Sequence, residues 1–155
     1  MHDSFLRRAI RLAVENVQSG RGGPFGAVIA KDGQVISEGS NRVTSANDPT
    51  AHAEVSAIRA ACQSLGRFDL RGCTIYSSCE PCPMCLGAIY WARLDALYFA
   101  ASHRDASSAG FDDSFIYTQV PLKAELRSLP THRSLEAEGG EPFALWVATE
   151  TKIPY

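Results

Sequence analysis

The fold class is decided by residues 73–101, which read CTIYSSCEPCPMCLGAIYWARLDALYFAA. Residues 73–78 are rich in β-forming side chains and predict a strand, and residues 81–92 predict a helix. Residues 96–101 form a continuous apolar run, which is typical of a buried parallel strand. Because two strands joined through a helix form a parallel pair in one sheet, this stretch predicts an α/β fold.

The preceding sequence adds a hairpin and two helices to this unit. Residues 4–19 carry apolar side chains at helical spacing and predict a helix that ends at a glycine. Residues 25–30 and 35–39 predict two strands joined by an Asp-Gly turn. Residues 51–65 are rich in helix formers and are also followed by a glycine. The predicted order, α, β, β, α, β, α, β, describes a mixed sheet covered by helices.

The last third of the chain is less regular. Residues 121–128 and 142–151 predict two helices, and residues 131–134 and 138–141 separate them as loops. The chain has 155 residues, of which 45% are hydrophobic and 21% charged. A chain of this size buries a core without disulfide support, so we expect a single domain over residues 1–155.

Charge and cysteine content limit the partners and the compartment. The net charge of −2 disfavours a nucleic-acid partner, because phosphate contacts require a basic face. The sequence has no secretory-signal pattern and no run that spans a bilayer, so we expect no membrane partner. Five cysteines lie within residues 62–85, an odd number that fits metal or catalytic use in the cytoplasm better than a disulfide framework.

Two short motifs carry the candidate chemistry, His52-Ala53-Glu54 and Pro81-Cys82-Pro83-Met84-Cys85. Cys82 and Cys85 are spaced to place both sulfurs on one face of a helix, at an N-terminus that favours thiolates. With His52 they supply three ligands for one Zn²⁺ per chain. Three protein ligands leave one coordination position open, which is the pattern of a catalytic rather than a structural zinc site.

Glu54 is the candidate acid and base of this site. Zinc lowers the pKa of its water toward about 7. A carboxylate that takes the water proton and returns it to a leaving amine completes a hydrolytic reaction. A zinc-stabilised binding module without catalysis is an alternative of a different class, but it has no use for an acid beside an open coordination position.

Cys79, three residues before Cys82, leaves two further alternatives, a four-ligand structural zinc site and an iron–sulfur cluster. The prolines around Cys82 disfavour the first, and the fourth cysteine of a ferredoxin run is missing for the second. Cys79 is therefore expected, with Cys62 and Cys73, to be a small buried side chain. The chain's other histidines, His2, His103 and His132, are expected on the surface.

The pairing of H-x-E with P-C-x-x-C is the signature of zinc nucleobase deaminases. On these motifs the chain resembles the cytidine deaminase superfamily, and within it the bacterial guanine deaminases. The likeness extends over residues 22–27, 47–54, 78–92 and 109–115. It implies a three-layer cytidine-deaminase-like fold, with a mixed sheet flanked by helices. It also implies zinc-dependent hydrolysis of guanine to xanthine and ammonia in purine catabolism.

The resemblance also implies roles for individual residues. Asp113 would be a second catalytic residue, as a polar contact and second proton carrier. The terminal Tyr155 would close the pocket, and with Asp113 it favours the guanine branch of the superfamily. The remaining substrate-binding residues implied are Asn41, the backbone N–H of Ala53, and an aromatic wall from Phe25 or Trp91. The implied assembly is a homodimer that exchanges its C-terminal segment.

Other substrates share the zinc motif. A tRNA adenosine deaminase has the same core, but it needs a basic surface to hold RNA, which the acidic balance of this chain disfavours. Guanosine, cytosine or another aminated heterocycle also fits the motif, because a few pocket side chains decide between such substrates.

Overall fold

The computed structural model describes residues 2–155. They form two compact units that divide after Asp113. The first unit contains α1 (His2–Gln18), β1 (Gly26–Lys31), β2 (Gln34–Ser40), α2 (Val43–Ala46), α3 (Ala53–Leu65), β3 (Thr74–Cys79), α4 (Pro83–Trp91), β4 (Ala96–Ala101) and α5 (His103–Ser108). The second contains α6 (Ser114–Gln119), two short 3₁₀ turns, η1 (Ala124–Leu126) and η2 (Glu138–Gly140), and α7 (Glu141–Ala148).

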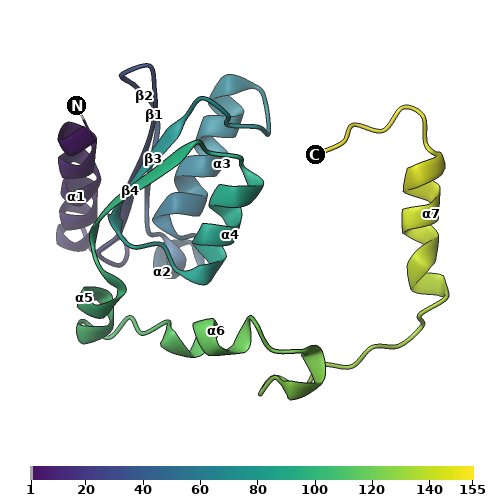
Figure 1. Cartoon of the computed structure of the whole chain (residues 1–155). Coiled ribbons are helices and arrows are strands. Elements are labelled where there is room, and N and C mark those ends of the chain that lie inside the picture. The colour runs from purple at the N-terminus through teal and green to yellow at the C-terminus, as the bar shows by residue number, and fades with distance from the viewer. Residues whose placement is uncertain (1) are drawn as a thin grey trace. The chain divides into compact units, whose positions relative to one another are not determined.

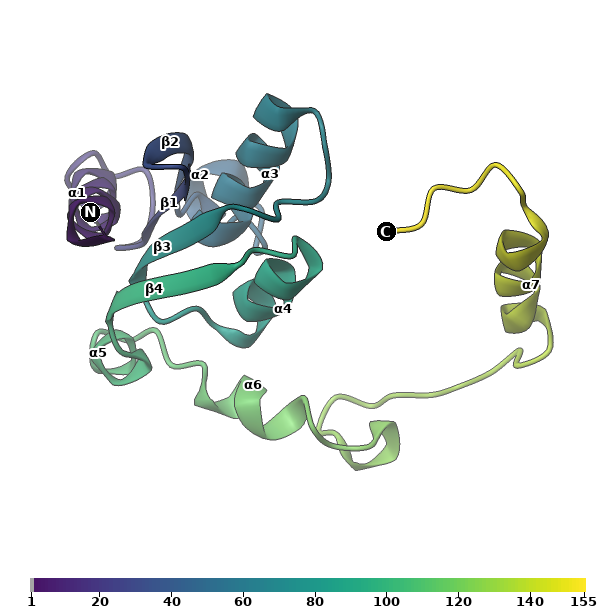
Figure 2. The same cartoon turned by 45° about the horizontal axis from the view of Figure 1, so that its top comes forward.

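The first unit is built on a mixed sheet with the strand order β2-β1-β3-β4. β1 is antiparallel to β2 and β3, whereas β3 and β4 are parallel. The turn between β1 and β2 has positive φ at Asp32 and Gly33, as the Asp-Gly sequence predicts. α1 covers one face of the sheet, and α3 and α4 cover the other (Figures 1 and 2). These three layers confirm the predicted α/β fold.

The core lies mainly between the sheet and the layer of α3 and α4. Ile29, Ile75 and Leu70 are fully buried there. α3 presents a row of alanines to the sheet, and these small side chains let the helix lie close to the strands. A second cluster, formed around Val28 and Tyr76, lies beneath α1. Packing in this core therefore holds α3 and α4 against the same face of the sheet.

β2 approaches the first turns of α3 at Gly39, where only glycine fits. A Cβ at this position would lie 2.1 Å from the carbonyl oxygen of Ala53 and 2.6 Å from the nitrogen of Ala57. We expect Gly39→Ala to lower the free energy of unfolding by about 1–3 kcal/mol, measured by urea unfolding, because the helix must shift.

Gly87→Ala is the matched control for this change. A Cβ at Gly87, in α4, would meet nothing within 4 Å. This variant should gain about 0.5–1 kcal/mol, because alanine costs less backbone entropy than glycine in a helix. An equal effect of the two substitutions on the free energy of unfolding would show that the close approach of β2 to α3 does not require glycine at position 39.

The structure also corrects the sequence predictions. β4 is parallel as predicted, but it is not buried: Tyr98 is 37% exposed and Phe99 43%. The reason is that β4 is an edge strand of the described sheet, so its apolar side chains meet few neighbours. Residues 121–128 form only the 3₁₀ turn η1, because so short a segment needs packing to remain helical, and it is almost entirely exposed. α2, α5 and α6 were not predicted, whereas α7 confirms the predicted last helix.

The second unit has no core of its own. No residue between 114 and 155 is buried. Its large apolar side chains are exposed, among them Phe143 at 73%, Leu145 at 71% and Val147 at 73% in α7. Among the helices of residues 2–155, none is both long and apolar enough to cross a membrane.

Candidate metal centre

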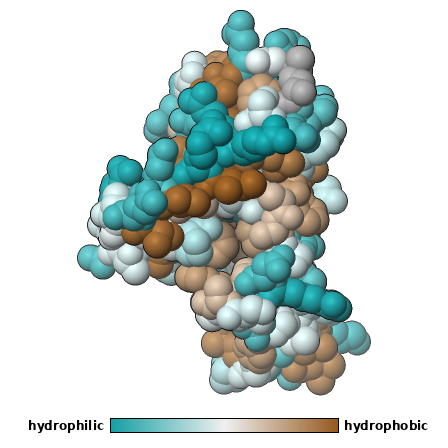
Figure 3. Space-filling view, turned by 90° about the vertical axis from the view of Figure 1, so that its left-hand side faces the viewer, coloured by the Kyte–Doolittle hydropathy of each residue, from teal (hydrophilic) through white to brown (hydrophobic). Residues whose placement is uncertain are grey.

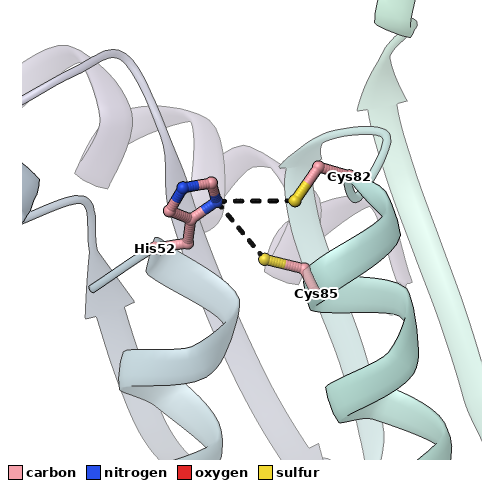
Figure 4. A group of neighbouring side chains, drawn as sticks. All are labelled: His52, Cys82 and Cys85. Atoms are coloured by element: carbon pink, nitrogen blue, oxygen red, sulfur yellow. Dashed lines mark hydrogen bonds between the residues drawn. The ribbon is translucent and has the colours of Figure 1, made fainter. Parts of the chain in front are cut away.

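His52, Cys82 and Cys85 meet where α3 and α4 begin (Figure 4). His52 is the N-cap residue of α3 and Cys82 is the N-cap residue of α4, both with extended backbone. Cys85 follows in the first turn of α4, which begins at Pro83 as helices often do. The two helix starts face each other because both helices pack on the same face of the sheet (Figure 1).

The spacing of the three side chains fits a zinc ion. The Nδ1 atom of His52 lies 3.6 Å from the Cys82 sulfur and 3.5 Å from the Cys85 sulfur. The three ligand atoms all lie within 4.8 Å of one another. Usual zinc–sulfur and zinc–nitrogen bond lengths in a tetrahedron separate these atoms by about 3.6 Å. The residues predicted as metal ligands are thus arranged as zinc ligands, with Nδ1 as the donor atom of His52.

The two thiols differ in their acidity. The pKa of Cys82 is lowered to about 4, mainly by a hydrogen bond from the Cys85 thiol and in part by His52. The same hydrogen bond, together with burial, raises the pKa of Cys85. The hydrogen bond to Cys82 also raises the pKa of His52. The pair therefore holds one thiolate, and a cation that displaces the remaining proton gains the second.

Glu54 lies directly beside these ligands. Its side chain, in the first turn of α3, is 5% exposed. The hydroxyl of Ser77 donates to its Oε1 at 3.2 Å, and the sulfur of Cys85 lies 3.4 Å from its Oε2. Burial is the main cause that raises the pKa of this carboxyl group. A carboxyl group with a raised pKa is suited to taking up and returning a proton.

Asn41 and Ala53 present hydrogen-bond donors on either side of His52 in the sequence. Asn41 follows the end of β2, and Ala53 is the first residue of α3. Asn41 is 7% exposed. Its Oδ1 accepts the backbone N–H groups of Gly23 and Val43, each at 3.3 Å. Within residues 2–155 its Nδ2 has no recorded partner, which leaves this donor for a ligand. The N–H of Ala53 is the first of α3, and such groups have no partner inside the helix.

Asp113 and two phenylalanines form the next part of the site. Asp113 is half-buried; burial mainly raises its pKa, and the negative charge of Cys82 adds to this effect. Asp113 therefore lies within electrostatic reach of the metal centre. Phe25 packs edge-on against Phe111, with ring centroids 5.0 Å apart. Phe111 was not among the predicted site residues, and the one signal for it in the sequence was its place two residues before Asp113.

The two remaining residues of the predicted pocket, Trp91 and Tyr155, are both exposed. Trp91 lies at the opposite end of α4 from Cys82, about 13 Å along the helix axis. It is 68% exposed. Tyr155 belongs to the second unit, is 72% exposed and packs edge-on against Trp146.

The other cysteines are not part of the ligand group. Cys79 and Cys73 are buried, and Cys62 is half-buried. The sulfur of Cys79 lies 3.5 Å from the carbonyl oxygen of Ser102. Within residues 2–155 the metal-ligand group has three members, so the structure gives no support to a four-ligand site or an iron–sulfur cluster.

The chain is similar to known proteins. The family model described as the cytidine and deoxycytidylate deaminase zinc-binding region matches residues 1–101. Guanine deaminase of Bacillus subtilis is 59% identical over 154 residues, which is 99% of each chain. An X-ray structure of guanine deaminase from Bacillus subtilis superposes with a TM-score of 0.98 at 56% identity, covering 100% of this chain and 99% of that one. A tRNA-specific adenosine deaminase of Agrobacterium fabrum is 49% identical, over 50% of this chain and 51% of its own length.

Proposed function

The chain belongs to the cytidine and deoxycytidylate deaminase family, and we propose that it is a zinc-dependent hydrolase that converts guanine to xanthine and ammonia. The observation that carries this proposal is a buried carboxyl group, Glu54, beside three side chains spaced as zinc ligands. The choice of guanine rests on the similarity to the Bacillus subtilis enzyme over nearly the full length of both chains. A zinc-stabilised binding module would leave Glu54 without a purpose.

The residues divide the reaction between them. His52, Cys82 and Cys85 would hold the zinc ion, which when bound supplies an activated water as the nucleophile. Glu54 takes one proton from this water and delivers it to the amino group, which leaves as ammonia. The second proton of the water moves from the oxygen to a ring nitrogen as the carbonyl forms. Because burial raises its pKa, Glu54 holds this proton more readily than an exposed carboxyl group.

Substrate binding falls to the donors and aromatic side chains around this centre. The Nδ2 of Asn41 and the N–H of Ala53 donate to the acceptor atoms of the purine. Asp113 accepts a hydrogen bond from the purine and serves as a second proton carrier. Phe25, supported by Phe111, packs against the ring.

Ammonia release from a panel of substrates tests this proposal. Purified protein should contain about one zinc per chain. It should release ammonia from guanine at least about a hundredfold faster than from guanosine, adenine or cytosine, because unpaired polar groups in a pocket cost that much or more. A tRNA anticodon hairpin should not be a substrate. Activity on the hairpin alone would instead place the chain with the tRNA deaminases, and silence on every substrate would favour the binding module.

Asn41→Asp separates substrate binding from folding. Aspartate keeps an oxygen for the N–H groups of Gly23 and Val43 but replaces the Nδ2 donor with an acceptor. We expect kcat/KM for guanine to fall by about a hundredfold, because an acceptor then faces an acceptor of the purine. Steady-state kinetics measure this loss, and the melting temperature should change by only a few degrees. Unchanged kinetics would remove Asn41 from the substrate site.

We also propose a homodimer that exchanges residues 114–155. These residues have no buried core, so they need a surface to pack on. The first unit offers an apolar groove of about 490 Å³ between α1 and β4, with Ile10, Val14 and Val17 along one side. Apolar side chains gather on this face of the molecule (Figure 3). In the exchanged dimer, residues 114–155 of one copy cover the other copy and bring Tyr155 to its metal centre.

The cellular setting follows from the same chemistry. The five cysteines of the described residues are free, and a centre with two thiolate ligands needs a reducing compartment. We therefore place the enzyme in the cytoplasm, acting in purine catabolism on a small-molecule substrate.

A further inference from the structure

A second titratable pair, Glu80 and His103, lies next to the metal centre and has no part in the chemistry above. Glu80 precedes the ligand Cys82 by two residues, and His103 is the first residue of α5. The backbone N–H of His103 donates to Oε2 of Glu80 at 3.1 Å, and the ring Nδ1 lies 2.9 Å from the same oxygen. One carboxylate oxygen thus ties the segment that carries Cys82 to the start of α5.

The parallel pairing of β3 and β4 makes this contact possible. Cys79 of β3 is in register with Ala101 of β4. Immediately after this pair, the N–H of Glu80 donates to the carbonyl oxygen of Ala101 at 2.8 Å. The two segments that follow β3 and β4 therefore leave the sheet side by side. The first leads to Cys82 and the second to α5.

α5 links His103 to the loop that carries Asp113. Ser102 and Asp105 form a reciprocal capping box that fixes the start of this short helix. At its other end, the N–H of Phe111 donates to the carbonyl oxygen of Ala106 at 3.0 Å. Phe111 then packs against Phe25. His103 is thus connected to Asp113 through bonded or packed residues along the whole path.

The charges around Asp113 give the pair a second effect. Burial is the main cause that raises the pKa of Asp113; the charges of Cys82 and Asp112 add to the rise, whereas His103 acts in the opposite direction. Exposed ion pairs contribute only about 0–1 kcal/mol to folding. The side chains of His103 and Glu80 are 51% and 32% exposed, so the contact adds little to global stability. Any effect of this contact is therefore local, on the segments that Glu80 and His103 join.

We propose that His103 is a positioning residue for substrate binding: through Glu80 and α5 it holds Asp113 beside the segment of Cys82, where Asp113 meets the purine. This inference rests on the proposed function, because it assigns Asp113 to the substrate. It makes α5 part of the substrate site although none of its side chains touches the purine.

A double-mutant cycle between His103 and Asp113 tests this coupling. His103→Ala should raise KM for guanine about tenfold, and its effect on kcat should not exceed that of Asp113→Ala, which removes the second proton carrier, since Glu54 and the zinc ligands are untouched. In an Asp113→Ala background, the same change should alter KM by less than about twofold. An equal effect of His103→Ala in both backgrounds would overturn the proposal.

Two variants separate positioning from charge and from general damage. His103→Asn places an amide nitrogen near the position of Nδ1, so it should restore most of the lost affinity without a charge. Arg104→Ala removes an exposed neighbour on α5 and should change neither KM nor kcat. Failure of His103→Asn to recover any affinity would contradict the positioning role.

Xanthine affinity and zinc content give readouts that do not depend on turnover. By calorimetry, His103→Ala should weaken xanthine binding about tenfold, again only when Asp113 is present. Zinc content should stay at about one per chain, since the metal ligands are intact. Loss of zinc would reassign His103 to the metal centre. Absence of guanine turnover in the unaltered protein would refute the proposed function. If the unaltered protein turns over guanine but the effects of His103→Ala and Asp113→Ala simply add, only the role of His103 is refuted.

Discussion

Glu54→Ala is expected to reduce guanine turnover by about 10²–10⁴-fold, the usual contribution of a general acid and base. The physical reason is that Glu54 is the buried carboxyl group beside the ligand group, 3.4 Å from the sulfur of Cys85. Ammonia release under saturating guanine measures the loss. The variant should still bind about one zinc per chain, because its three ligand side chains are intact.

Glu54→Gln is the matched control for this substitution. Glutamine keeps the shape of the side chain and an oxygen for the hydroxyl of Ser77, but it cannot take up the proton. Both variants should therefore lose activity to the same extent. Neither should unfold: burial raises the pKa of Glu54, which means that its charged form does not stabilise the folded state. Turnover above about a tenth of the original rate in either variant would contradict a general acid–base role.

The features that the sequence predicted well depend on short stretches of chain. The Asp-Gly turn and the strand–helix–strand unit of residues 73–101 are set by local pattern. The grouping of His52, Cys82 and Cys85 was also predictable, because His52 and Cys82 each fall at the start of a predicted helix. Their meeting then requires only that both helices pack on one face of the sheet.

The features that were missed depend on contacts between distant parts of the chain. The exposure of β4 depends on what lies beside the edge of the sheet, which the apolar run of residues 96–101 does not state. His103 was expected as an ordinary surface histidine, and its bond to Glu80 arises from the register of β3 and β4. The position of Trp91 at the other end of α4 from Cys82 has a similar cause, since nearness to a motif in sequence does not give nearness in space.

The exchange of residues 114–155 predicts that two inactive chains restore each other. One chain carries Glu54→Ala and has an intact C-terminal segment, and the other carries Tyr155→Ala and has an intact Glu54. In an exchanged heterodimer, one of the two sites combines the intact Glu54 of one copy with the intact Tyr155 of the other. Random mixing makes half of the dimers heterodimers, so co-expressed chains should show about a quarter of the original activity.

A dimer without exchange predicts no recovery of activity in the mixture. If each C-terminal segment covers its own chain, every site in every dimer contains one defect, and the mixture stays as inactive as its components. Size-exclusion chromatography with light scattering gives the mass of the mixed species, which must be dimeric for either outcome to count. A dimer without recovered activity would refute the exchange while leaving the homodimer intact. A monomer that deaminates guanine would refute both, since residues 114–155 would then have to find their packing surface within their own chain.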